Sequence, residues 1–213
     1  MIIYGMPRSH SSLFLQSALR TDRLNEPFDR RTLFGADPRR AFFWPELYQR
    51  RKPTKMFQRL NQENTAVKFF GSSLYYCLEA RSWFKDTEDS HTVYITQRSL
   101  QDQLLSHIIA TEFGFSLREE TASNPVEIPD SHFHILTLEL DSFLRFFPKK
   151  GRIISLNNYP QEDFDLTQAQ VKPQNTLARA EYITNLDRCR EKIERLVEYY
   201  SKDYAKAFDN LKP

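Results

Sequence analysis

Four short apolar segments, each typical of a buried strand, constrain the fold of this chain more than any other feature of its sequence. They are rich in Ile, Val, Tyr and Phe, and they lie at residues 1–4, 65–71, 91–98 and 151–159. Segments with helical periodicity follow them, so that strand and helix patterns alternate along the chain. Such alternation is typical of a parallel sheet with helices on both faces. The sequence therefore predicts an α/β fold, a three-layer sandwich around a central parallel sheet of about four to five strands.

The helical patterns differ in length and are separated by polar or basic connections. They start at Ser11 or Ser12 and recur at residues 54–61, 72–86, 99–114, 131–147 and 177–208, the last as one long helix or two. Residues 29–53 are instead predicted to be an irregular basic insertion with arginine pairs and prolines. Because 213 residues suffice for one good-sized domain with a substantial core, we expect residues 1–213 to form a single domain.

Charge and composition limit the cellular compartments and the classes of binding partner that are expected for this protein. The formal net charge of +2 is too small to imply a general attraction to nucleic acid. No stretch approaches the roughly 20 apolar residues of a membrane-spanning helix, and the amino terminus does not resemble a signal peptide. Cys77 and Cys189 form no CxxC motif, so thiols in a reducing compartment are expected. These features predict a cytoplasmic protein that binds neither nucleic acid nor membranes.

The first predicted strand runs directly into a turn suited to an anion. The sequence here is MIIYGMPRSHSS, in which Gly5 is followed by Arg8 and by three serines. Backbone N–H groups at a helix start point toward a bound anion, and the helix dipole favours negative charge there. Arg8 would add a permanent cation with a planar set of donors. The turn lacks the GxxxxGK[ST] sequence of ATP- and GTP-binding loops, which weighs against a nucleotide kinase.

A second turn of similar chemistry follows the third predicted strand, in the sequence YITQRSLQDQLLS. Arg98 ends the strand, and Ser106 comes eight residues later, two turns into the next helix. An arginine at a strand end and a hydroxyl set back on the helix can hold one phosphate from two directions. Ligands of open parallel sheets bind beyond the carboxyl ends of the strands, which is where both turns are expected.

Each turn also has an ordinary structural explanation. The first is compatible with a capped helix start that binds nothing. Arg98 is compatible with a solvated residue at a strand end, and Ser106 with a hydroxyl bonded to its own helix. The occurrence of both turns in the right order on an α/β pattern favours the anion site over these alternatives.

The two turns resemble motifs of sulfotransferases that use 3′-phosphoadenosine-5′-phosphosulfate (PAPS), in particular bacterial and carbohydrate-type members. IYGMPRSHSS is similar to the 5′-phosphosulfate loop, which typically reads PRSG[ST][ST] between a strand and a helix. Arg98 and Ser106 have the spacing of the family's 3′-phosphate motif. NEPF, which contains Glu26, resembles the acidic segment after the first helix of carbohydrate-type and bacterial members. The clear resemblance covers residues 1–28 and 92–112.

The resemblance implies a P-loop-NTPase-like sulfotransferase fold and a PAPS-dependent sulfotransferase activity that needs no metal. The sulfuryl group would pass by in-line displacement to a hydroxyl acceptor, either a carbohydrate or a small molecule. Arg8 and the loop amides would stabilise the 5′-phosphosulfate as charge grows on the leaving phosphate. Arg98 and Ser106 would hold the 3′-phosphate. The resemblance places four further residues in the nucleotide site: Ser9, His10, Ser11 and Ser12.

The phosphate motifs of the family do not by themselves assign the base that takes the acceptor proton. Some family members have a histidine after the second strand, where this chain has Phe70. Glu26 is the first candidate, because its counterpart in carbohydrate-type members is a proposed base, and His10 is the second. For Glu26 the alternative is a loop carboxylate paired with Arg30 or Arg31.

Departures from the family pattern keep other functions open. His10 stands where the loop motif usually has glycine, and the RKG-type segment near the carboxyl terminus is missing, although Lys172 and Arg179 lie in that region. A catalytically degenerate nucleotide-binding module is therefore an alternative to the enzyme, as is a P-loop-like nucleotide kinase. His132 and His134 form an H-x-H pair without a third ligand nearby in the sequence, so no metal site is expected there.

Overall fold

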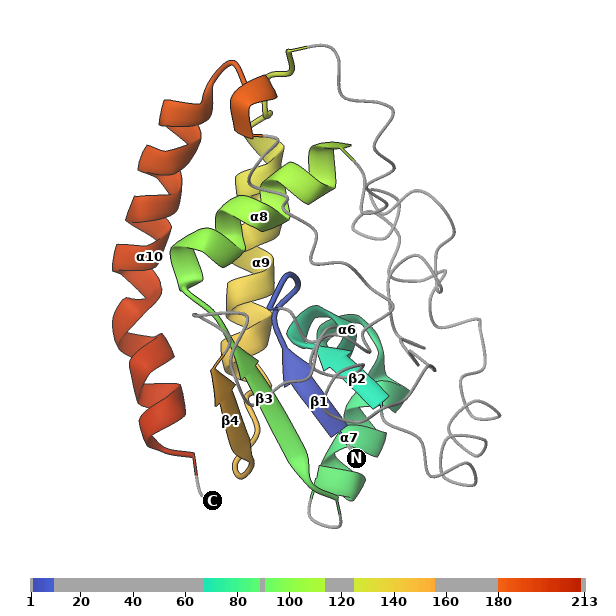
Figure 1. Cartoon of the computed structure of the whole chain (residues 1–213). Coiled ribbons are helices and arrows are strands. Elements are labelled where there is room, and N and C mark those ends of the chain that lie inside the picture. The colour runs from blue at the N-terminus through green and yellow to red at the C-terminus, as the bar shows by residue number, and fades with distance from the viewer. Residues whose placement is uncertain (1, 10–66, 89–90, 114–124, 156–179, 212–213) are drawn as a thin grey trace, which may run out of the picture.

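The computed structural model describes residues 2–9, 67–88, 91–113, 125–155 and 180–211, which form an α/β fold with a four-stranded parallel sheet (Figure 1). The strands are β1 (Ile2–Gly5), β2 (Val67–Phe70), β3 (Val93–Gln97) and β4 (Arg152–Ser155). Their order in the sheet is β2-β1-β3-β4, and every neighbouring pair is parallel. Each strand overlaps a segment in which a strand was predicted, so the α/β class and the parallel sheet are confirmed.

The described helices are α6 (Gly71–Tyr76), α7 (Leu78–Glu88), α8 (Leu100–Phe113), α9 (Ser131–Arg145) and α10 (Leu186–Asp209). Of the two alternatives for the carboxy-terminal segment, the structure shows one long helix, preceded by a short 3₁₀ turn at residues 180–182. The predicted helix that starts at Ser11 or Ser12, the one at residues 54–61 and the basic insertion at residues 29–53 lie outside the described residues.

The single helix predicted at residues 72–86 is wrong, because two helices, α6 and α7, meet at Cys77. The backbone of Cys77 is extended, with φ −115° and ψ 103°, and this conformation ends α6. Arg81 stabilises the break from the next helix, donating from Nε to the carbonyl of Leu74 at 3.0 Å and from Nη2 to that of Tyr75 at 2.9 Å. Carbonyls in the last turn of a helix lack partners within it, so these bonds cap α6. The break between the two helices could not be predicted from the sequence, because apolar residues continue across it.

An aromatic cluster packs the central strand against α7 and α9. Tyr4 of β1 is fully buried, and its ring stacks on Phe143 with the two centroids 5.2 Å apart. Phe84 contacts both Tyr4, at 5.7 Å, and Phe69 of β2, at 5.3 Å. The Tyr4 hydroxyl donates to the carbonyl of Phe143 at 2.7 Å, so burial leaves no unpaired phenol. Burial also raises the pKa of Tyr4 well above its usual value, which keeps the hydroxyl a donor.

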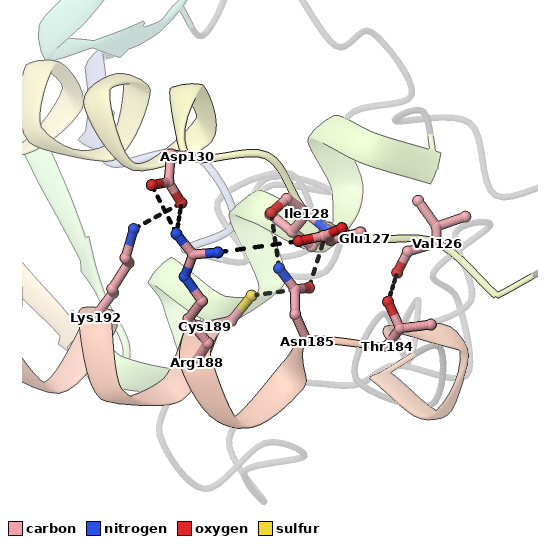
Figure 2. Close-up of polar contacts among 9 residues, drawn as sticks. All are labelled: Val126, Glu127, Ile128, Asp130, Thr184, Asn185, Arg188, Cys189 and Lys192. Atoms are coloured by element: carbon pink, nitrogen blue, oxygen red, sulfur yellow. Dashed lines mark hydrogen bonds and ion pairs between the residues drawn. The ribbon is translucent and has the colours of Figure 1, made fainter.

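A polar clamp joins the segment before α9 to the start of α10 (Figure 2). The side chain of Asn185 bonds to Ile128 in both directions, because Oδ1 accepts from its N–H at 3.0 Å and Nδ2 donates to its carbonyl at 2.9 Å. The Asp130 carboxylate accepts two bonds from Arg188, both 2.9 Å long, and lies 2.6 Å from Nζ of Lys192. Exposed ion pairs individually contribute little to the free energy of unfolding. We therefore infer that the clamp mainly orients α10 relative to the segment before α9.

The described residues also include both cysteines and the H-x-H pair. Cys77 and Cys189, both of which the structure describes, are buried and form no disulfide. Within the described ranges, no helix is both long and apolar enough to cross a membrane. His132 and His134 lie in the first turn of α9, where His132 is buried with Nε2 3.1 Å from Oε2 of Glu112. Among the described side chains, no three His, Cys, Asp or Glu residues gather as a metal site would require.

The close approach of α6 to α9 makes Gly71 sensitive to substitution. A Cβ atom at this position would lie 2.3 Å from the backbone nitrogen of Phe143, and backbone cannot move aside as a flexible side chain can. We predict that Gly71→Ala lowers the free energy of unfolding by about 3 kcal/mol or more, at the upper end for overpacked cores. Urea unfolding measures the change. Lys202→Ala, at an exposed position of α10, is the control and should change it by no more than about 0.5 kcal/mol.

Candidate functional site

The strand order brings the two predicted anion turns to the same place. The connection that leaves β1 leads to β2 on one side, and the connection that leaves β3 leads to β4 on the other, so the two run in opposite directions across the sheet. Ligands of open parallel sheets bind at such a switch point, beyond the carboxyl ends of the strands. The turn after β1, drawn in dark blue in Figure 1, projects from this end of the sheet near α8. The candidate site therefore lies between β1 and β3.

Arg8 links the two turns directly. Its Nε donates to Oγ of Ser106 at 3.2 Å, across 98 residues of sequence. The backbone of Arg8 is left-handed, with φ 66°. In a non-glycine residue this conformation costs about 1–3 kcal/mol and persists only where surrounding contacts hold it. A strained arginine in the turn after a central strand is a feature that active sites and ligand-binding loops often share.

Ser9 anchors the same turn to β3. Its side chain is fully buried, and its Oγ lies 2.7 Å from Oγ1 of Thr96. Gly5 leaves room for this hydroxyl pair, since a Cβ there would lie 2.4 Å from the Thr96 oxygen and 2.7 Å from the Ser9 oxygen. The hydroxyl of Ser9 is thus already bonded within the protein, which gives it a role in holding the turn.

Gln103 of α8 makes a third contact with the turn. Its Nε2 donates to the carbonyl of Pro7 at 3.0 Å, and only 1% of the side chain is exposed. A buried amide donor on a backbone carbonyl orients the peptide group that precedes Arg8. Thr96 and Gln103 were not predicted to belong to the site, although both lie within the sequence YITQRSLQDQLLS that identified the second turn, because only its arginine and Ser106 were assigned to a phosphate.

Arg98 contributes a partly desolvated cation at the end of β3. Burial lowers the pKa of its guanidinium, and the nearby carboxylate of Asp102 partly offsets the shift. An arginine stays protonated at neutral pH in any protein environment, so the desolvated charge is permanent. An anion beside Arg98 would restore the interactions that water no longer supplies.

The structure describes four of the eight predicted site residues. Arg8 and Ser106 are in direct contact, although the resemblance assigned them to opposite ends of the nucleotide. Arg98 lies between β3 and α8, the helix that carries Ser106, and Ser9 is bonded to Thr96. The remaining four lie outside the described residues: His10, Ser11, Ser12 and Glu26.

Comparisons of the chain with models of protein families, with curated proteins and with solved structures found no match. The function of the site therefore has to be inferred from its own residues.

The buried hydroxyl pair predicts a specific pattern of stabilities. Ser9→Ala and Thr96→Val each leave the other hydroxyl buried without its partner, which should lower the free energy of unfolding by about 1–3 kcal/mol. The double variant removes both groups and should cost clearly less than the sum of the two single variants. Chemical unfolding of the four proteins measures this coupling.

Thr137→Val is the matched control, because Thr137 is half-buried and donates to the carbonyl of Phe133 within its own helix. It should show no coupling to Ser9→Ala. Strictly additive losses for Ser9 and Thr96 would contradict the assigned hydrogen bond.

Proposed function

We propose that this chain is a PAPS-dependent sulfotransferase whose nucleotide binds at the carboxyl ends of β1 and β3. The observation that carries the proposal is the hydrogen bond from Arg8 Nε to Ser106 Oγ. It joins the two turns that separately resemble the 5′-phosphosulfate and 3′-phosphate motifs of that family. The turns that follow two adjacent parallel strands lie at one edge of the sheet, and a ligand that spans both motifs would bind at this edge. The P-loop-NTPase-like sulfotransferase fold, with helices on both faces of the sheet, is part of this proposal.

The charges of the site suit a nucleotide with two separate anionic groups. The 3′-phosphate of PAPS carries close to two negative charges near neutral pH, and the 5′-phosphosulfate adds further negative charge. Arg8 and Arg98 supply permanent cations with planar sets of N–H donors, which bind phosphate oxygens in pairs. Because a guanidinium has five such donors, Arg8 can contact Ser106 and a phosphosulfate oxygen together.

The proposed reaction is an in-line displacement at sulfur. The acceptor oxygen forms a bond to sulfur while the bond from sulfur to the bridging oxygen breaks, and that oxygen leaves on the 5′-phosphate with the electron pair. Arg8 and the loop amides stabilise the charge that develops there, as in phosphoryl transfer. Glu26 takes the proton of the acceptor hydroxyl, with His10 as the second candidate base. Catalysis then rests on positioning and electrostatics, and no metal is required. The acceptor is a carbohydrate or another small molecule.

Nucleotide binding tests the proposal and separates it from a kinase. Adenosine 3′,5′-bisphosphate, the product nucleotide, should bind by calorimetry more tightly than ATP with magnesium. Arg98→Ala should weaken its binding by about tenfold or more, as expected for a lost charge-assisted contact.

Arg152→Ala is the control for this variant. Arg152 is an exposed arginine at the opposite end of the same sheet, paired in register with Tyr94, and its loss should leave the affinity unchanged. Absence of measurable binding of the bisphosphate to the unaltered protein would exclude the proposed function, and preference for ATP with magnesium would favour a nucleotide kinase.

Turnover separates the enzyme from a catalytically degenerate binding module. Transfer of labelled sulfate from PAPS to a panel of carbohydrates and small alcohols is the measurement. Glu26→Gln should lower that rate by about 10²–10⁴-fold, the range for loss of a general base, without changing the affinity for adenosine 3′,5′-bisphosphate. Glu194→Gln, at an exposed position of α10, is the control. An unchanged rate in Glu26→Gln would exclude Glu26 as the base, and binding without any transfer would favour the binding module.

A further inference from the structure

Three consecutive residues of the turn after β1 are each bonded to the unit formed by β3 and α8. We call this set of contacts the clasp. The donor-to-acceptor distances are 3.0, 3.2 and 2.7 Å for the pairs Gln103–Pro7, Arg8–Ser106 and Ser9–Thr96. The residues that hold the turn from β3 and α8 are at least 98% buried. The bond between Ser9 and Thr96 is buried and the other two are partly buried, so the three together can define one conformation of the turn.

Within the clasp, Gln103 acts on the peptide group that sets the backbone of Arg8. The ring of Pro7 restricts its own φ, so the remaining freedom of this peptide plane lies in ψ of Pro7 and φ of Arg8. The bond from Gln103 Nε2 fixes the direction of the Pro7 carbonyl and therefore restricts both angles. Arg8 is held at φ 66°, a conformation that it would not adopt unaided.

We propose that Gln103 is a positioning residue of the anion site, which orients Arg8 through the Pro7 carbonyl so that its guanidinium meets the phosphosulfate group. This inference rests on the proposed function, since it requires an anion at Arg8. It assigns a role in binding to a buried residue that is not itself expected to touch the nucleotide. The same geometry explains why an unbranched amide is suited to this position of α8, since it reaches across to the neighbouring turn.

Gln103→Met is a clean test of the role. Methionine is unbranched, similar in length and equally favourable in a helix, but it has no N–H donor. Within the described part of the chain, Oε1 of Gln103 accepts no hydrogen bond, so among the contacts described there the bond to Pro7 is the one side-chain hydrogen bond that the substitution removes. Gln101→Met, at an exposed position on the same helix, is the matched control. If Gln103→Met does not fold, Gln103→Leu serves as the second variant.

The first of two measurements on these variants needs no ligand. Amide hydrogen exchange, followed by mass spectrometry on the amino-terminal peptide, reports whether the turn opens more often. Gln103→Met should speed exchange of this peptide by about tenfold, as expected for the loss of one buried hydrogen bond, and Gln101→Met should not. Equal exchange in both variants would overturn the inference that Gln103 holds the turn.

The second measurement is a double-variant cycle on the affinity for adenosine 3′,5′-bisphosphate. Gln103→Met alone should weaken binding by about tenfold, and Arg8→Ala should weaken it at least as much. If Gln103 acts through Arg8, the double variant should bind no more weakly than Arg8→Ala alone. Additive losses, or an unchanged affinity in Gln103→Met, would overturn the positioning role while leaving the proposed function intact. Failure of the unaltered protein to bind the nucleotide would instead overturn the proposed function.

Discussion

The parallel pairing of β1 with β3 is the constraint on which the candidate site depends. The register sets Gly5 beside Thr96, so the chain leaves both strands at the same level of the sheet. The turn after β1 then lies against α8, where Arg8 comes within hydrogen-bond distance of Ser106. A shift of one residue would point Thr96 to the other face and would remove the partner of Ser9. The aromatic packing of Tyr4 against α7 and α9 resists such a shift.

The candidate site combines buried neutral contacts with partly exposed charge. The hydroxyl pair and the amide of Gln103 are shielded from water, so they can hold a strained turn without the desolvation cost that a buried charge would incur. Arg8 and Arg98 are only half-buried. The two cations therefore remain at the surface, where an anion can reach them. The conformation of the turn is held by neutral groups that do not titrate near neutral pH.

Several features of the fold could be predicted from local sequence. The four strands were recognisable because each is a short apolar run rich in β-branched and aromatic residues, and α9 because its apolar spacing is regular. The break at Cys77 was not recognisable, since it depends on Arg81 reaching back to the end of α6. Arg8, Arg98 and Ser106 were identified by their residue types after strands. Thr96 and Gln103 were missed because a threonine in a strand and a glutamine in a helix carry no such signal.

By itself the sequence determined the strand–helix alternation, the parallel sheet and the residue types of the two turns. These properties follow from local hydrophobic periodicity and from the chemistry of individual side chains. Only the tertiary structure decided which strands are neighbours and which side chains meet. The contacts of Ser9, Pro7 and Arg8 with the β3–α8 unit span 87, 96 and 98 residues of sequence. They depend on the side of β1 to which β2 and β3 are added, and no local pattern encodes that choice.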